Sequence, residues 1–411
     1  NKRGKNQVRI GFDSQVNIPS DRNNYQILLR PDIWYNGFDG VKLGMNIHGD
    51  YLKTHHVFDL TFHVNTGVGQ WDLSDYVGAS DYRFMSFRFD YQTSMARIWK
   101  RSDLILSGRV LDGLYHYDLG IEKRSRNRKV RFKIYYRSLY RYLRSDLAYL
   151  LNSSNWNSGL FNNTVNLEMK YSFRHTGGKG TVEMAVRGSG PGSDYGYGVF
   201  KVELKDNVNL GRLKLRSRVY GRLGTGNVAP ESALYLDRAS PEEMTFNKYT
   251  RSIGMIPTKW AEYGNIPSHF HHGGGLNLRG YTSYLSPETD KNGNIQFIYQ
   301  GNSGAAINIE LEFDELFGFK PNFTKRWLDI DLYIFADAGT INIRKDGDMA
   351  MAIPRADAGI GSSLTIKRWG VLDKVKPLTI RFDMPLYLSN APALKPNNFQ
   401  FNWMLGVGRA F

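Results

Sequence analysis

The chain has 411 residues, no cysteine, 42 Gly, 25 Tyr and 23 Phe, and a formal net charge of +15. Its mean hydropathy is negative, and no stretch approaches the roughly 18 apolar residues of a membrane helix, which argues against a helical membrane protein. The cations alternate with apolar residues along the chain, so we expect a charged lumen or contact with acidic lipid headgroups and no nucleic-acid partner. The chain begins with Asn1 and shows no apolar signal segment. We therefore expect a mature product or a piece of a longer protein.

Apolar and polar residues alternate along about sixteen segments of the chain. In Val130–Arg137 the even positions are apolar or aromatic and most odd positions are cationic. A period of two puts the two sets on opposite faces of a strand. The segments lie near 26–35, 39–49, 54–65, 83–91, 102–111, 113–123, 128–138, 163–173, 180–188, 193–205, 211–223, 304–314, 329–340, 355–367, 376–385 and 400–411.

Most of these segments have about ten residues, which is enough to cross a bilayer as a tilted strand. Their number is even, as is usual in bacterial single-chain barrels. The sequence thus predicts an all-β fold, a sixteen-stranded antiparallel transmembrane β-barrel over 26–411, with a periplasmic linker over 1–25. A soluble all-β sandwich is the alternative.

One link between the predicted strands is much longer than the others. The stretch of about 224–303, called loop six below, shows no sustained alternation and carries five prolines and an Asp-Lys-Asn-Gly turn signal. A connection of this length in a compact fold is usually functional. If the N-terminus is periplasmic, this loop starts outside the cell, and we expect it to fold into the lumen.

Loop six carries an arginine that can meet acidic residues of the lumen. On the segment 304–314 the lipid-facing set includes Ile309, which turns Glu310 and Glu312 inward; Asp337 lies on the polar face of the next segment. A pairing of Arg279 with these carboxylates would pin the loop inside the barrel, with the bidentate fork fixing its geometry. A solvated arginine and unpaired lumen acids are the alternative that the residues leave open.

Three segments resemble motifs of the BamA and two-partner-secretion transporter superfamily, also called the bacterial surface antigen family. Leu278-Arg279-Gly280-Tyr281 resembles its loop-six motif, and Phe335-Ala336-Asp337-Ala338-Gly339 is similar to its strand-thirteen motif. Ile309–Phe313 resembles the strand-twelve segment whose glutamate meets the arginine, which matches Glu310 first and Glu312 second. The resemblance implies a sixteen-stranded barrel with this loop between strands eleven and twelve. The C-terminus is similar to an outer-membrane β-signal at Gly406 and Phe411, whereas Arg409 departs from it.

The family normally carries POTRA domains before the barrel, whereas only about 25 polar residues precede the first predicted strand of this sequence. The texture of 247–251 and 269–281 resembles the barrel fused behind gluzincin-peptidase-like domains in Bacteroidota, which implies an upstream peptidase domain. The chain itself contains no His-Glu-x-x-His motif, so the barrel is expected to be non-enzymatic and without a cofactor.

Loop six also contains three histidines, which are weak metal candidates. His269 and His271 would share one face of a strand, two ligands short of a zinc site unless carboxylates join them. With His272 they are more simply interpreted as a solvated loop cluster, and no metal is expected.

The expected location is the bacterial outer membrane, as an integral protein in contact with lipid and lipopolysaccharide. The leading hypothesis is a membrane anchor or export conduit for an attached peptidase-like or secreted domain, with lipoproteins as further partners. An insertase or translocase that works through the seam between the first and last strands is the second hypothesis. A diffusion pore is the third.

Overall fold

The computed structural model describes residues 7–12, 24–71, 83–261, 268–282, 286–289, 295–317, 327–345, 348–367, 377–390 and 397–411. The described residues form 23 strands and only short helical turns, which confirms the predicted all-β fold. None of their helices has the length and apolar character needed to cross a membrane. The chain divides into two compact units, which we describe separately. Unit 1 comprises Asn1–Met169, Arg187–Gly196 and Arg251–Met255, and unit 2 comprises Lys170–Val186, Tyr197–Thr250 and Ile256–Phe411.

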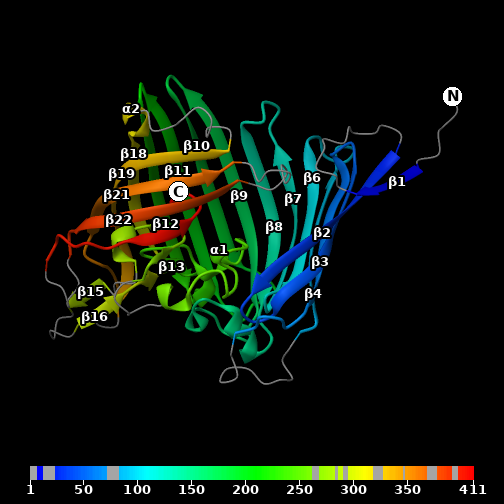
Figure 1. Ribbon diagram of the computed structural model, residues 1–411, viewed down its shortest axis with the longest axis horizontal. Coiled ribbons are helices and arrows are strands. Elements are labelled where there is room, and N and C mark those ends of the chain that lie inside the picture. Colours follow the sequence, from blue (N-terminus) through cyan, green and yellow to red (C-terminus); the bar gives the residue numbers. More distant parts are fainter. Residues whose placement is uncertain are drawn as a thin grey trace. The chain divides into compact units, whose positions relative to one another are not determined.

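Unit 1 is a ladder of antiparallel strands that are neighbours in the sequence (Figure 1). Its strands are β2 (Asn24–Asn36), β3 (Gly40–Tyr51), β4 (His55–Asn65), β5 (Met85–Ser94), β6 (Ser102–Leu111), β7 (Leu114–Arg124) and β8 (Val130–Tyr140). Two short 3-10 helices follow β8, η2 (Arg144–Tyr149) and η3 (Ser153–Asn155). Asp112 and Gly113 form the tight turn between β6 and β7, and both have positive φ.

Unit 2 contains a second antiparallel ladder, again mostly between sequence neighbours. Its strands are β11 (Tyr197–Leu210), β12 (Leu213–Gly226), β18 (Gly304–Glu312), β19 (Leu328–Lys345), β21 (Arg355–Ile366), β22 (Leu378–Leu388) and β23 (Met404–Val407), with the short β20 (Asp348–Met351) beside β19. The short helix α2 (Asp314–Phe317) follows β18. The boundary between the two units runs through β9 (Asn162–His175) and β10 (Gly178–Ser189).

Loop six lies between β12 and β18 and consists of short elements. These are η4 (Pro230–Ser232), β13 (Leu234–Tyr235), α1 (Pro241–Met244), η5 (Thr258–Trp260), β14 (Phe270–His271), η6 (Arg279–Tyr281), β15 (Ser286–Thr289), β16 (Ile295–Ile298) and β17 (Gln300–Gly301). Strand β13 pairs with β17 and β15 with β16. Strand β14 instead pairs in parallel with β23, so loop six adds two residues to the edge of the last strand.

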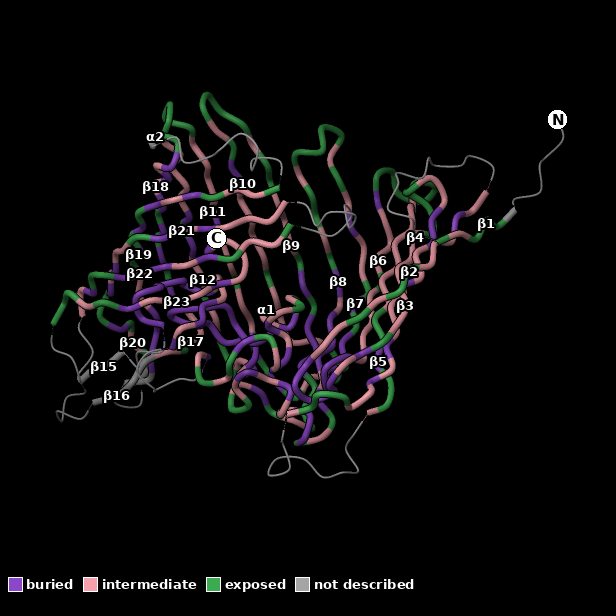
Figure 2. The backbone as a smooth tube through the Cα atoms, in the orientation of Figure 1, coloured by how far each residue is buried: buried purple, intermediate pink, exposed green. Residues whose placement is uncertain are grey.

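The strands expose their apolar side chains and bury their polar ones. On β7, Tyr117 and Leu119 are exposed, whereas His116 and Asp118 are buried. The same inversion occurs on β18, where the burial class changes along the strand, as the colours in Figure 2 show. A soluble strand normally buries its apolar face, so this pattern is typical of strands that face lipid on one side.

Each predicted segment contains a strand, but the strands differ from the prediction at both ends of the chain. The predicted linker 1–25 contains the strand β1 (Gln7–Phe12), which pairs in parallel with β2. The last predicted segment, 400–411, is a strand only over Met404–Val407. The described pairings within either unit do not close a barrel.

Candidate functional site

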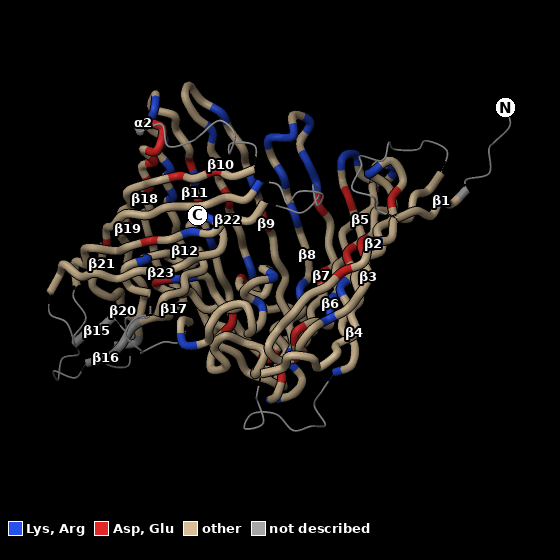
Figure 3. The backbone as a smooth tube through the Cα atoms, in the orientation of Figure 1, with Lys and Arg blue, Asp and Glu red and all other residues tan. Residues whose placement is uncertain are grey.

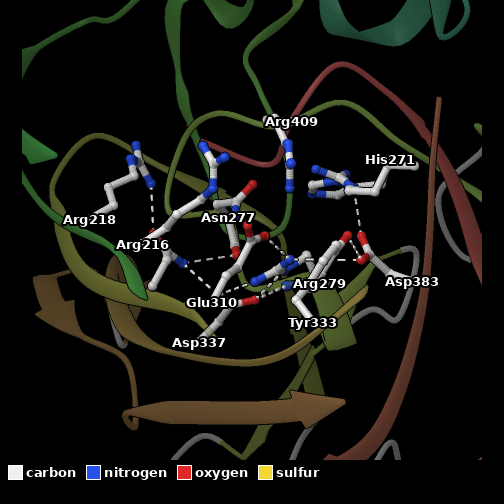
Figure 4. Close-up of polar contacts among 12 residues, drawn as sticks. Arg216, Arg218, His271, Asn277, Arg279, Glu310, Tyr333, Asp337, Asp383 and Arg409 are labelled. Carbon is white, nitrogen blue, oxygen red and sulfur yellow. Dashed lines mark hydrogen bonds and ion pairs between the residues drawn. The ribbon is translucent and has the colours of Figure 1, made fainter. Parts of the chain in front are cut away.

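Arg279 opens the 3-10 helix η6 of loop six, and its side chain is 0% exposed. Its Nε donates to Oδ2 of Asp337 at 2.8 Å and one terminal nitrogen donates to Oδ1 at 3.1 Å, a bidentate fork (Figure 4). The other terminal nitrogen donates to Oε1 of Glu310 at 2.6 Å. The structure therefore brings together the loop-six arginine and one carboxylate from each of two neighbouring strands.

The register of β18 on β19 places these two carboxylates side by side. Asn308 pairs with Asp337, and Glu310 pairs with Phe335. All four point to the polar face because their positions differ by two along each strand. The ring of Phe335 lies 3.9 Å from the guanidinium carbon of Arg279, close enough for a cation–π contact.

Polar contacts also hold the loop backbone next to Arg279. Asn308 donates to Oδ1 of Asp337 at 3.0 Å and to the carbonyl oxygens of Leu276 and Asn277 at 3.2 and 3.1 Å. Arg218 on β12 donates to the carbonyl oxygen of Gly275 at 2.8 Å. The loop is thus held by its backbone as well as by its arginine.

The other motif residues pack tightly around this site. Leu278 and Tyr281 belong to a buried apolar cluster that also includes Leu276 and Leu388. A Cβ on Gly280 would lie 2.6 Å from Cβ of Asp357 on β21, as well as 2.4 Å from Cδ2 of Leu388. The motif therefore requires glycine at this position for steric reasons, and its neighbours fill the space around the arginine.

A Cβ on Gly339 would lie 2.7 Å from the carbonyl oxygen of Ala305 and 3.1 Å from Cδ1 of Leu278. This glycine of the strand-thirteen motif thus leaves room for the loop to approach β19.

The electrostatics of the site keep Arg279 charged. Burial alone lowers the pKa of its guanidinium, but Asp337 and Glu310 raise that pKa well above its ordinary value. Because two carboxylates share one arginine, removing the arginine would leave both buried without compensation, which is costly. We call Arg279, Glu310 and Asp337 the lock.

A second group of charged side chains extends the lock toward the C-terminal strands. Asp383 on β22 accepts from the hydroxyl of Tyr333 at 2.6 Å and forms an ion pair with Arg381 at 2.6 Å. Arg279 lies 3.8 Å from the same carboxylate. Arg381 also contacts Nδ1 of His271. One connected polar network therefore joins loop six to β18, β19 and β22.

The three histidines of loop six do not converge on a metal site. Nε2 of His271 donates to the carbonyl oxygen of Asp237 at 2.7 Å, while His269 stacks on Trp403 at 3.8 Å. His272 contacts the carbonyl oxygen of Gly273. The interpretation of a solvated cluster is wrong for His271, which is fully buried. Burial and the adjacent Arg381 lower the pKa of its imidazole well below the ordinary value.

The prediction that Glu312 also meets Arg279 is wrong. Its side chain lies one inward position beyond Glu310, a step of about 7 Å along a strand. Oε1 of Glu312 instead accepts from Arg216 at 2.5 Å and lies 3.1 Å from Arg409. The basic residue that departs from the β-signal therefore turns toward acidic side chains and does not face lipid.

Glu312, Asp314 and Asp331 form a group of carboxylates close enough to share a metal ion. Two of them already form ion pairs with arginine, because Arg409 bonds Asp331 as well as Glu312. Arg216 and Arg409 therefore supply the positive charge that compensates these carboxylates.

The C-terminal strand packs against loop six. A Cβ on Gly406 would lie 2.9 Å from the carbonyl oxygen of His271, and one on Gly273 would lie 2.2 Å from the carbonyl oxygen of Ala410. The backbone nitrogen of Leu405 donates to the carbonyl oxygen of His269 at 2.7 Å. Close packing against loop six thus explains the glycine at position 406. Phe411, at the end of the sequence, is half-buried.

A second buried ionic cluster lies in unit 1 and was not predicted. Lys42 is 0% exposed and its ammonium lies 2.7 Å from Asp39 and 3.0 Å from Asp112. Arg251 of loop six pairs with Asp112 at 2.5 Å. Burial raises the pKa of Asp112, but Lys42 and Arg251 together hold it well below the usual range.

Backbone contacts next to Arg251 hold the same part of the loop. The nitrogen of Ile253 donates to the carbonyl oxygen of Tyr149 at 2.8 Å, and the nitrogen of Gly37 donates to the carbonyl oxygen of Ile253 at 2.9 Å. Loop six therefore has a second anchor.

No protein-family model and no curated protein matches the chain. Among solved structures, CdiB from Escherichia coli has 13% identity and a TM-score of 0.43, with 92% of this chain and 61% of that chain covered. The chain thus spans about three fifths of the length of that protein.

BamA from Haemophilus ducreyi, lacking POTRA domains 1-3, has 13% identity and a TM-score of 0.43, with 94% and 73% covered. OccAB2 from Acinetobacter baumannii has 9% identity and a TM-score of 0.40, with 89% and 76% covered.

Proposed function

We propose that the chain forms an integral β-barrel of sixteen strands in the bacterial outer membrane. Two observations support the membrane location: the strands expose apolar and aromatic side chains, and their opposite faces bury charged ones. Strands of 10 to 14 residues, such as β6 and β11, are long enough to cross a bilayer when tilted. The remaining pairing, between the first and last strands, would close the barrel and remove both edges.

The observation that carries the assignment to a BamA-like barrel is the lock. Arg279, Glu310 and Asp337 come from three separate segments, each of which resembles a motif of the same superfamily. All three meet in one buried site at hydrogen-bond distance. A coincidence of three motifs at one point is much more specific than an isolated Arg-Gly-Tyr sequence.

The function we assign is that of a membrane anchor and export conduit for an attached domain, which we propose to be peptidase-like or secreted. The lock supports a conduit with a controlled opening, because it holds loop six in place with buried charge pairs. The same feature argues against a permanently open diffusion pore. Lipid, lipopolysaccharide and lipoproteins are the partners that such a role implies.

An insertase or translocase is the second candidate. It is favoured by the strands at the ends of the two ladders, since β1 adds to β2 in parallel and β14 adds to β23. A short strand from the same chain protects the edge of a sheet, and an incoming strand can replace it. In this reading β1 and β14 occupy the positions that a client strand would take.

Membrane fractionation and a reporter fusion test the proposal. The full chain should stay in the outer-membrane fraction after an alkaline wash and migrate faster before heating than after it. A folded reporter placed before Asn1 should become accessible to protease added to intact cells if the barrel exports attached domains. A chain that the alkaline wash removes would overturn the membrane assignment. A reporter that stays inside while small solutes cross at porin rates would overturn the conduit in favour of a pore.

A further inference from the structure

Two neighbouring turns of unit 1 carry an unusual concentration of exposed cations. The turn between β5 and β6 and the turn between β7 and β8 lie at the same end of their strands, where Figure 3 shows Lys and Arg gathered. We call this set the basic rim. It consists of Arg97, Lys100, Arg101, Arg126, Arg128 and Lys129, all of which are exposed.

The acidic side chains nearby are already paired with other arginines. Nε of Arg124 donates to Oε1 of Glu122 at 2.8 Å, and a terminal nitrogen of Arg124 lies 3.8 Å from Asp103. Arg131 lies 3.8 Å from the second oxygen of Glu122. Within the described part of the chain, the side chains of the basic rim have no ion-pair or hydrogen-bond partner. Their charge is available to a ligand.

The turns do not need these cations in order to fold. In the second turn, the hydroxyl of Ser125 accepts from the nitrogen of Val130 at 3.0 Å, and the side-chain oxygen of Asn127 accepts from the nitrogen of Lys129 at 3.0 Å. Arg101 and Arg128 have φ of 61° and 57°, a conformation that favours glycine or asparagine. Arginine at both positions is therefore better explained by its charge than by the turn.

Apolar side chains lie directly beside the cations. Ile98 is 84% exposed and Trp99 is 47% exposed at the tip of the first turn. The outward-facing residues of β7 are apolar until Lys123, whose ammonium lies 4.0 Å from the centre of the Trp99 ring. A tryptophan and cations at the end of an apolar strand face are typical of the boundary between hydrocarbon and lipid headgroups.

We propose that the basic rim binds the phosphate headgroups of anionic phospholipids. The argument rests on the proposed membrane function, because it takes the outward face of β7 as lipid-facing. Charge complementarity favours an anion, and the neighbouring Trp99 and Ile98 favour a membrane surface over a water-soluble acidic protein. With the segment 1–25 in the periplasm, as the sequence predicts, both turns of the basic rim face the periplasm, where the leaflet consists of phospholipid.

Spin-labelled lipids test this inference with the full chain in bilayers of phosphatidylcholine. The quantity measured is the association of labelled phosphatidylglycerol with the protein relative to labelled phosphatidylcholine. The wild type should prefer phosphatidylglycerol at 0.1 M NaCl and lose most of the preference at 1 M NaCl, because the screening length falls from about 10 to about 3 Å.

The variant R126Q/R128Q/K129Q should lower that preference. Each surface cation strengthens anionic-lipid binding about fivefold, so the loss of three should lower the preference clearly, although only the lipids beside the basic rim are affected. The control R144Q/K248Q/K259Q removes the same charge from exposed positions of other loops. It should leave the preference unchanged.

The outcomes separate this inference from the proposed function. If no spin-labelled lipid is immobilised at the surface of the protein, the membrane assignment itself would be overturned. Restricted lipid with no preference for phosphatidylglycerol, or an equal loss in both variants, would overturn the basic rim alone. A preference for spin-labelled lipid A without one for phosphatidylglycerol would also overturn it, since the rim would then face the other leaflet.

Discussion

The substitution Arg279→Ala should release loop six from the lock. It removes the fork to Asp337, with distances of 2.8 and 3.1 Å, and the 2.6 Å bond to Glu310. Breaking a buried ion pair by removing one partner costs about 3–5 kcal/mol. At about 1.4 kcal/mol per factor of ten, the open population of the loop should rise by about two to three and a half orders of magnitude.

A single-cysteine probe measures this opening directly. The chain has no cysteine, and Thr282 next to the lock is 0% exposed, so Thr282→Cys creates one protected thiol. Maleimide labelling of that thiol should become at least about a hundredfold faster in Arg279→Ala. The variant Arg279→Lys should give an intermediate rate, because it keeps the charge and loses the fork.

The double variant Arg279→Ala/Asp337→Asn provides a control on the electrostatic reasoning. It removes one of the two carboxylates that the single variant leaves uncompensated. Its labelling rate should therefore lie below that of Arg279→Ala. Equal labelling in wild type and Arg279→Ala would refute the reasoning, because the buried ion pairs would then contribute nothing to holding the loop.

Three further predictions follow from the same structure. Gly280→Ala should open the lock by about 1–3 kcal/mol through overpacking, seen as faster labelling of the Thr282→Cys probe. Arg251→Ala should expose the second anchor, measured as faster labelling of Ser252→Cys, since residue 252 is buried. The lock should weaken as the pH falls below about 6.5. Burial lowers the pKa of His271, so its imidazole takes up a proton only when the loop opens, and acid therefore favours the open loop. The labelling rate, corrected for thiol ionisation, should then rise by up to about tenfold per pH unit, and less so in His271→Gln.

Matched variants keep these predictions specific. Gly196→Ala is the control for the first, because nothing lies within 4 Å of its added Cβ, and it should leave the Thr282 probe protected. Arg144→Ala removes an exposed cation and should not change labelling at Ser252. For the pH series, a rate that falls on acidification would contradict the sign, since a depressed pKa confers stability above about 6.5 and loses it below.

The sequence predicted the strands well because the alternation of apolar and polar residues determines both the strand and its faces. Segment 304–314 shows the reasoning: its inward residues follow from the alternating apolar set Ile307, Ile309, Leu311 and Phe313. The same pattern could not predict β1, where Val8 and Ile10 alternate with polar residues over only six positions. Nor could it predict that the last strand is short, since the pairing of Leu405 and Gly406 with loop six depends on tertiary contacts.

The site was predictable where a motif or strand parity applied and not elsewhere. Parity turned Glu310 and Glu312 inward alike, and only the competing arginines Arg216 and Arg409 separate them. The second anchor involves Arg251, for which the resemblance of 247–251 implied no partner. Its partner Asp112 comes from a turn more than a hundred residues earlier, so periodicity carries no information about the contact.

The ionic conductance of the full chain in planar bilayers tests the central claim most directly. A locked loop six predicts a low conductance for the wild type and a clearly higher one for Arg279→Ala, with Arg144→Ala unchanged. A wild type that conducts like an open porin, with no change in Arg279→Ala, would contradict the claim that the buried pairing of Arg279 with Asp337 and Glu310 holds loop six in place and so restricts conduction.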